Sequence, residues 1–150
     1  MPSDLPQLDL EAQLCFPLYA ASRALTRRYA PLLAETGLTY PQYLSMLALW
    51  EGDEPMTVGE LGRRLRLDSG TLTPVLKRLE QAGHLVRRRD PSDERRVLLA
   101  VTDAGWRLRQ EVAEVPSRLL AGVEMSPTDG AELHRLLGEL ITELDRLGPG

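Results

Sequence analysis

Two short amphipathic segments separated by only three residues constrain the fold of this chain more than any other feature. Thr57 opens a capping box, which predicts a helix over residues 58–65. After a turn at residues 66–68, either Asp68 or Ser69 caps a second helix. Two helices joined by so short a turn form a helix-turn-helix unit.

The second helix of this unit has an inward-facing stripe and a defined end. The stripe residues recur at helical spacing: Leu72, Val75, Leu76 and Leu79. Pro74 falls within or just after the first turn, where a proline is less costly than in mid-helix. Gly83 is placed to end the helix in the left-handed conformation that glycine adopts readily.

Two strand-like segments follow the helix-turn-helix unit. Residues 85–88 and 97–101 have the composition of short strands, and residues 90–94, Asp-Pro-Ser-Asp-Glu, are typical of a turn. A helix-turn-helix followed by a β-hairpin with a charged tip is a winged helix. The sequence therefore predicts a mainly α fold with a small β-hairpin wing.

Further helices are expected on the N-terminal side. Apolar residues recur at helical spacing from Leu10 to Leu33, and Pro17 predicts a kink or a break beside Cys15 because a proline has no N–H to donate. A second capping box, opened by Thr39, predicts a helix that runs through Trp50 and stops at Glu51-Gly52.

Two more helices are expected on the C-terminal side. Thr102 caps a long helix that runs to about Val123 and is interrupted or bent at Pro116, and Ser126-Pro127 begins the last helix. The last helix carries an apolar stripe: Leu133, Leu136, Leu137, Leu140, Ile141, Leu144 and Leu147.

The flanking helices carry more apolar surface than a small winged helix needs to cover its core. We therefore expect them to pack against a second copy in a homodimer; the alternative is a self-contained three-helix cap. On the dimer interpretation residues 1–150 form one domain, with dimerisation helices at about 10–38 and 103–147 and a winged helix-turn-helix region at about 39–102.

Charge is unevenly distributed along the chain. The net charge is −4, but residues 57–105 contain ten basic and seven acidic side chains, a net +3, while the rest carries eight basic and fifteen acidic, a net −7. A basic centre between acidic flanks is expected if one face meets phosphates. By charge alone, a solvated mosaic is an equally good interpretation.

Composition excludes several classes of protein. The single cysteine, Cys15, excludes an internal disulfide framework and cysteine-rich zinc sites, and His84 and His134 lie too far apart to suggest a metal or other cofactor. No apolar run reaches the ~20 residues of a membrane span, and no secretory leader is visible, so a cytoplasmic location is expected. No catalytic triad, phosphate-binding loop or acid/base pair appears, so we do not expect an enzyme.

Four local strings resemble the MarR family of winged-helix regulators, and specifically its organic hydroperoxide resistance regulator branch, of the one-cysteine type. The resemblance covers roughly Leu10 to Leu147. The strings are Leu14-Cys15-Phe16, Thr39-Tyr40-Pro41-Gln42-Tyr43-Leu44, Asp68-Ser69-Gly70-Thr71-Leu72-Thr73-Pro74 and Asp90-Pro91-Ser92-Asp93-Glu94-Arg95-Arg96.

The resemblance implies a dimeric repressor on pseudo-palindromic, double-stranded operator DNA. The helix that opens at Ser69 would enter the major groove, although Ser69 has capping as an alternative role. The candidate DNA contacts in this helix are Ser69, Gly70, Thr71, Thr73 and, as a phosphate contact, Lys77. In the wing, Arg95 is expected to reach the minor groove, Asp93 to brace it, and Arg96 to join the same charge network.

The resemblance also implies a redox sensor at Cys15. From periodicity alone, a cysteine on an apolar helix face is usually an inert small hydrophobe. In the family branch, a tyrosine pair hydrogen-bonds the reactive cysteine across the dimer interface, which points to Tyr29 and Tyr40, with Tyr19 as a third member; Tyr43 is expected in the core. An organic hydroperoxide would oxidise Cys15 to a sulfenic acid, which a low-molecular-weight thiol completes or further peroxide overoxidises.

Two alternatives remain at this stage. The first keeps the fold but replaces the signal: a MarR-type repressor released by a small aromatic or phenolic ligand. The second is a thiol peroxidase that uses Cys15 catalytically, although the chain has no peroxidase motif and no resolving cysteine.

Overall fold

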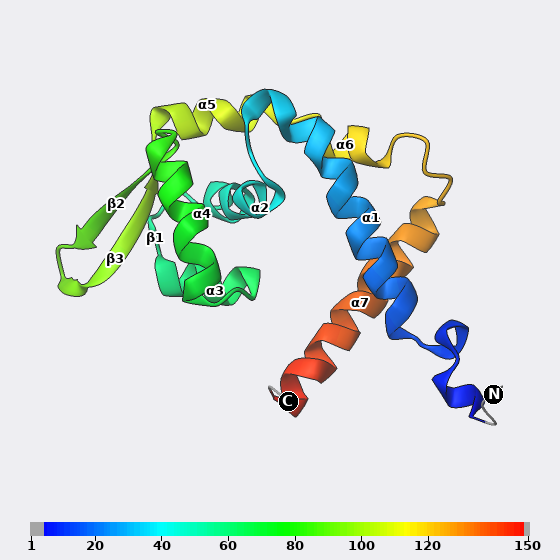
Figure 1. The fold of residues 1–150 in the computed structure, drawn as a ribbon. Coiled ribbons are helices and arrows are strands. Elements are labelled where there is room, and N and C mark those ends of the chain that lie inside the picture. The colour runs from blue at the N-terminus through cyan, green and yellow to red at the C-terminus, as the bar shows by residue number, and fades with distance from the viewer. Residues whose placement is uncertain (1–4, 149–150) are drawn as a thin grey trace. The chain divides into compact units, whose positions relative to one another are not determined.

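A computed structural model describes residues 5–148 of the chain. They fall into two compact units, one ending at Leu119 and one beginning at Leu120 (Figure 1). The first unit contains the winged helix and the second contains the last helix, and each is described by itself.

The N-terminal apolar run is not one helix. It begins with two short 3-10 turns, η1 (Pro6–Leu8) and η2 (Leu10–Ala12), and helix α1 extends over Cys15–Leu33. The predicted break therefore lies just before Cys15. Pro17 is the third residue of α1, where the N–H that it lacks would have no intrahelical partner in any case.

Helix α2 (Tyr40–Trp50) begins with the predicted capping box. Gln42 N donates to Thr39 Oγ1 at 3.4 Å, and Thr39 N donates to Gln42 Oε1 at 2.9 Å. Between α1 and α2 a further 3-10 turn, η3 (Ala34–Thr36), ends at Gly37, whose φ of 69° is left-handed. Helix α2 follows this turn, and seven of its eleven residues are buried.

Helix α3 (Val58–Leu65) has the predicted bounds, and helix α4 (Ser69–Gln81) begins where the sequence predicts. Of the two N-cap candidates for α4, the structure uses Asp68, whose carboxylate accepts the Thr71 N–H at 2.8 Å; Ser69 is the first helical residue. Gly83 is left-handed beyond the helix end, as predicted, with φ 79°.

The wing is longer than the sequence indicated and is joined by a third strand. Strands β2 (Leu85–Asp90) and β3 (Asp93–Val101) pair antiparallel from Leu85↔Val101 to Asp90↔Asp93. A two-residue strand that we did not predict, β1 (Met56–Thr57), pairs with β3, so that the strand order is β1-β3-β2.

The helix expected from Thr102 to Val123 is two helices. Thr102 caps α5 (Asp103–Glu111), as predicted, and α6 (Val115–Leu120) follows after a break at residues 112–114. The interruption therefore precedes Pro116, which is the second residue of α6.

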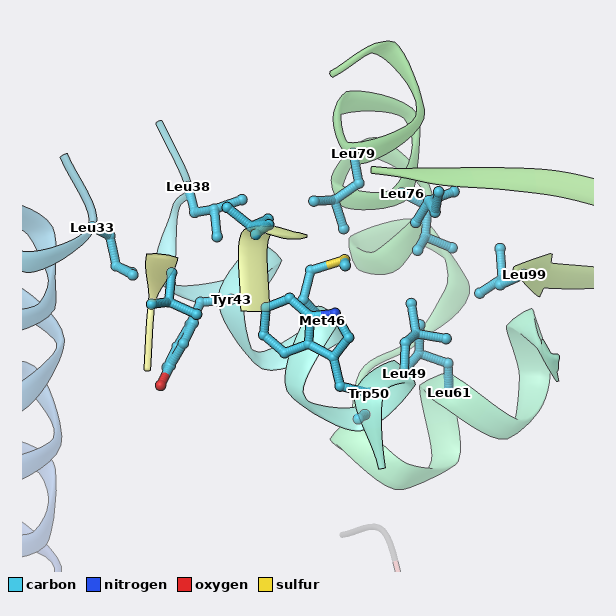
Figure 2. Packing of buried hydrophobic residues seen from close by; sticks show 14 of the residues in the cluster. Leu33, Leu38, Tyr43, Met46, Leu49, Trp50, Leu61, Leu76, Leu79 and Leu99 are labelled. Atoms are coloured by element: carbon cyan, nitrogen blue, oxygen red, sulfur yellow. The ribbon is translucent and has the colours of Figure 1, made fainter. Parts of the chain in front are cut away.

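A single core lies where α2 meets the winged helix (Figure 2). Leu61, Leu72 and Leu99 are at most 1% exposed and come from α3, α4 and β3. Trp50 adds a polar anchor: its Nε1 donates to the Gly105 carbonyl at 3.0 Å. A Cβ on Gly105 would lie 2.1 Å from the His84 carbonyl oxygen, so only glycine permits this close approach.

The second unit is built around α7 (Pro127–Leu147), which starts at the predicted Ser126 cap with a proline at its first position. No residue of α7 is buried. Five of its large hydrophobic side chains are 40–70% exposed: Leu133, Leu136, Ile141, Leu144 and Leu147. Among residues 5–148 there is no helix long and apolar enough to cross a bilayer.

Candidate nucleic-acid interface and redox site

Helix α4 has a buried face and an exposed face. Leu72, Leu76 and Leu79 are at most 1% exposed, so they fix the helix against the core. The predicted DNA contacts all lie on the exposed side: Ser69, Gly70, Thr71, Thr73 and Lys77. The structure therefore presents the N-terminal half of α4 to solvent as one polar surface.

The two threonine hydroxyls of this surface already donate hydrogen bonds. Thr71 Oγ1 donates to Asp68 Oδ2 at 3.1 Å, and Thr73 Oγ1 donates to the Ser69 carbonyl at 2.6 Å. A hydroxyl oxygen that donates can still accept, and both residues are exposed, so these side chains are suited to accept from base amino groups. The hydrogen bonds from Thr71 also lower the pKa of Asp68, which stabilises the cap as a carboxylate.

The wing presents one arginine held by its neighbour. The Arg95 side chain is 91% exposed, and its Nε donates to Asp93 Oδ1 at 3.1 Å. The Arg95 backbone N–H donates to the same oxygen at 3.1 Å. Asp93 therefore orients Arg95 while the guanidinium remains accessible.

Arg96 belongs to a different network from Arg95. Its guanidinium contacts Asp90 Oδ2 at 3.4 Å and Glu60 Oε1 at 3.8 Å, which links β3 to the end of β2 and to α3. Hydrogen bonds from Ser92, supported by the charge of Arg96, lower the pKa of Asp90. Arg96 is thus held by ion pairs within the winged-helix region, whereas Arg95 is held by Asp93 alone.

The sequence analysis did not single out Arg88 or Asp90. Arg87 pairs with Glu80 at 2.9 Å and Arg89 donates to the Glu94 carbonyl at 2.7 Å. Arg88, between them on β2, is exposed, and within residues 5–148 its side chain has no ion-pair or hydrogen-bond partner. The run of three arginines was visible in the sequence, but only the strand register distinguishes its members.

Cys15 is exposed at the first position of α1. Tyr19, one turn further along, is 59% exposed, and Arg23, another turn along, donates to the Tyr19 hydroxyl at 2.8 Å. Side chains on a helix lean toward its N-terminus, so Arg23 lies over Tyr19 and Tyr19 lies toward Cys15. Arg23 was not predicted, although its i, i+4 spacing from Tyr19 is a readable signal.

The predicted tyrosine pair forms the centre of a tyrosine cluster, here Tyr29, Tyr40 and Tyr43. The rings of Tyr29 and Tyr40 stack with centroids 4.2 Å apart, and Tyr43 lies 5.6 Å from Tyr29. Burial, together with the neighbouring phenols, raises the pKa of Tyr29 to about 12, and burial raises the pKa of Tyr43. Both phenols are therefore neutral donors at physiological pH. Tyr43 is 1% exposed, in the core as predicted.

One chain does not bring Cys15 to the tyrosine cluster. Tyr29 follows Cys15 by 14 residues within α1. At about 1.5 Å of rise per residue, the two positions are ~21 Å apart along the helix axis. Any hydrogen bond between this sulfur and these phenols must therefore come from two different chains.

The described residues contain no group of three or more histidine, cysteine or acidic side chains arranged to hold a metal ion. The polar surface of α4 with the wing, and the Cys15 end of α1 with the tyrosine cluster, are thus the two candidate sites.

Comparison with known proteins places the chain in a family. A sequence profile of the SarA/Rot transcriptional regulators matches residues 27–112. The organic hydroperoxide resistance transcriptional regulator of Bacillus subtilis (strain 168) is 45% identical over 147 residues, which cover 98% of this chain and 97% of the relative. The HTH-type transcriptional regulator TtmR of Methylorubrum extorquens (strain PA1) is 54% identical over 144 residues, covering 96% and 71%.

Solved structures agree with the sequence relatives. The structure of reduced AbfR bound to DNA is 38% identical and has a TM-score of 0.81, covering 97% of this chain and 99% of that one; AbfR comes from Staphylococcus epidermidis. These relatives are transcription regulators, a class without enzymatic activity. This chain is therefore a winged helix-turn-helix transcription regulator that belongs to the MarR family, in its organic hydroperoxide resistance branch.

Proposed function

We propose that the chain is a homodimeric repressor that binds operator DNA and releases it when an organic hydroperoxide oxidises Cys15. The observation that carries the proposal is the separation of Cys15 from the tyrosine cluster along α1. A lone exposed sulfur at one helix end and neutral phenol donors at the other form a complete site only when two chains meet.

The DNA-binding part rests on α4 and the wing. The exposed polar surface of α4 fits the major groove, where Ser69, Gly70, Thr71 and Thr73 contact bases and Lys77 a phosphate. Arg95, braced by Asp93, reaches the adjacent minor groove. AbfR has been solved on DNA, which supports the same use of the shared fold here.

The dimer part rests on uncovered apolar surface. Leu14, Phe16 and Leu18 near the start of α1 are 37–76% exposed, and five of the seven α7 stripe residues are 40–70% exposed. Surface of this kind is covered in soluble regulators by a second copy. A symmetric dimer would also place Cys15 of each chain beside the partner's Tyr29 and the partner's Tyr40.

The sensing step is a two-electron oxidation. The Cys15 thiolate attacks one peroxide oxygen, the O–O bond breaks, and the alcohol leaves after it takes up a proton, so the sulfur is oxidised and the peroxide is reduced. The phenols that donated to a thiolate now face a bulkier, differently charged group. The site lies on dimer-forming helices, so this change alters the relative orientation of the two winged helices on the operator.

The state that releases DNA is expected to be a mixed disulfide with a low-molecular-weight thiol. An overoxidized AbfR has been solved bound to DNA, which favours the mixed disulfide over the sulfinate as the releasing state in this chain. The mixed disulfide adds a whole side group at Cys15, whereas sulfinate adds only two oxygens.

A gel-shift assay with the promoter region of the regulated gene tests the proposal. Cumene hydroperoxide plus a small thiol should release wild-type protein, and Cys15→Ser should bind but not respond. Tyr29→Phe should bind DNA and respond to the peroxide more slowly. Tyr19→Phe, measured beside it, distinguishes the role of Tyr19 in the response from that of the Tyr29–Tyr40 pair. A Cys15→Ser protein that releases DNA as wild type does would contradict the sensor.

A second candidate signal has one observation in its favour. A groove of about 600 Å³ in the first unit is lined by Tyr43, Trp50 and Arg109 among others, which suits a small aromatic anion. A repressor released by such a ligand would still respond after its cysteine is alkylated. The same assay with iodoacetamide-treated protein therefore separates the two signals.

A further inference from the structure

We propose that Arg88, on the face of the wing away from α4, binds a phosphate of the DNA strand across the minor groove from α4. The inference rests on the proposed DNA-binding function and adds a contact to those of α4 and of the wing tip. It starts from the three consecutive arginines of β2, Arg87, Arg88 and Arg89, whose surroundings differ.

Two of these arginines are held within the chain. The Arg87 guanidinium pairs with Glu80 Oε2 of α4 at 2.9 Å, and Arg89 Nη1 donates to the Glu94 carbonyl at 2.7 Å. Arg88 is exposed, and its side chain has no ion-pair or hydrogen-bond partner in the part of the chain that the structure describes. Its guanidinium is therefore the one of the three that is available to another molecule.

The strand register places Arg88 on the face of the wing away from α4. Successive side chains of a strand point to opposite faces of the sheet. Arg87 and the residue opposite it, Leu99, lie on the face that meets α4, since Arg87 reaches Glu80 and Leu99 is 1% exposed. Arg88 pairs with Leu98 on the other face. Its strand, β2, also forms one edge of the sheet (Figure 1).

The position of Arg88 along the strand matches the depth of a DNA groove. Arg88 precedes the last residue of β2, Asp90, by two positions, which is about 7 Å at about 3.3 Å per residue. The minor groove is about 7.5 Å deep, with a phosphate backbone along each side. A wing whose tip enters this groove therefore brings Arg88 level with the phosphates. Because Arg88 faces away from α4, it meets the backbone that is farther from α4.

A phosphate suits this side chain, because guanidinium groups bind phosphate oxygens in a two-pronged manner. Such a contact sets the position of the protein on the duplex and carries no base preference. The alternative is that Arg88 only keeps the exposed edge of β2 from pairing with another sheet, a common use of charge at edge strands. Salt dependence separates the two roles, because only the phosphate contact releases counterions from DNA.

The test measures binding of the full chain to a random-sequence duplex of about 30 base pairs, at about 50 to 200 mM salt. Arg88→Gln should make the log–log salt slope less steep by about 1.8, from one lost phosphate contact in each subunit. The loss of affinity across this salt range should then be about twelvefold smaller than in the wild type. The Tm should stay within about 2 °C of the wild-type value, because the side chain is exposed and unpaired among the described residues.

Two matched variants make the result decisive. Arg88→Lys keeps the charge and should keep the slope. Arg107→Gln, at an exposed arginine of α5, removes the same charge outside the wing and should also keep the slope. A wild-type slope for Arg88→Gln, or an equal reduction for Arg107→Gln, overturns the phosphate contact and leaves the proposed repressor intact. Wild-type protein whose DNA binding does not depend on salt would instead overturn the proposed function itself.

Discussion

The winged-helix region and helix α7 carry similar apolar stripes, but the stripes differ in burial. In α4 the stripe residues Leu72, Leu76 and Leu79 are at most 1% exposed. In α7, Leu136 and Leu144 are 47% and 55% exposed, and no residue of the helix is buried. The same spacing of apolar residues thus gives a buried face in α4 and an exposed face in α7.

The difference separates two sources of stability. The winged-helix region buries its own apolar residues within one chain, so it can hold the exposed polar side chains of α4 in place by itself. Helix α7 has its capping at both ends but no core of its own, so its stability must depend on what covers its stripe. The proposed DNA-binding surface and the proposed dimer interface therefore lie in regions that should respond differently to mutation.

The largest expected effect comes from the same substitution in both regions. Leu76→Ala should lower the free energy of unfolding by about 3–5 kcal/mol, because it leaves a cavity in a packed core. Leu144→Ala should change the unfolding of dilute protein by less than about 1 kcal/mol but weaken self-association. Urea denaturation at several protein concentrations measures both; equal losses at every concentration would remove the distinction.

A pair of glycines tests how tightly the core is closed. Gly105→Ala should destabilise by about 2–4 kcal/mol, since its Cβ would lie 2.1 Å from a backbone carbonyl. Gly59→Ala, in α3, meets no atom within 4 Å and should be neutral or slightly stabilising. Thermal melts decide the matter, and similar Tm values for the two variants would contradict the packing described here.

The exposed stripe of α7 can be tested by charge. Leu136→Glu should convert the proposed dimer into a monomer, because a carboxylate in an apolar interface is desolvated without a partner. Thr142→Glu, an exposed residue outside the stripe, adds the same charge and should leave the dimer intact. Light scattering after gel filtration measures the mass; a dimeric Leu136→Glu protein would place the interface elsewhere.

The smallest expected effect is on stability at alkaline pH. The pKa of Tyr29 is raised to about 12, so its contribution to folding is fully present below pH 10 and is lost as pH rises from 10 toward 12. Tyr29→Phe should remove the latest tyrosine transition in an absorbance titration and lessen the loss of stability above pH 10. Unchanged titration curves would mean that Tyr29 is not the shifted phenol.

Local signals in the sequence accounted for much of the fold. The capping boxes at Thr39 and Thr57 and the caps at Thr102 and Ser126 fixed four helix starts, because a cap depends on residues within one turn. The prediction was less complete where partners lie far apart in sequence. Strand β1 is only two residues long and exists because β3 pairs with it.

The candidate sites were predictable by residue type but not by arrangement. The strings around Cys15 and Ser69 identified the family, which the comparisons confirm. They did not show that Arg96 contacts Asp90 and Glu60, because those partners come from the end of β2 and from α3. Nor does any short pattern predict that Arg66, at the end of α3, has a left-handed backbone with φ 56°, since glycine is the usual residue in that conformation.

Helix α1 carries its thiol at one end and its phenol Tyr29 at the other. Under the proposed mechanism an isolated subunit therefore has a cysteine without its donors, and the sensor exists only above the concentration at which subunits pair. Each pair would contain two equivalent sensors, so a mixed dimer with one Cys15→Ser subunit would keep one of them. Peroxide sensitivity would then scale with the abundance of the regulator as well as with the oxidant.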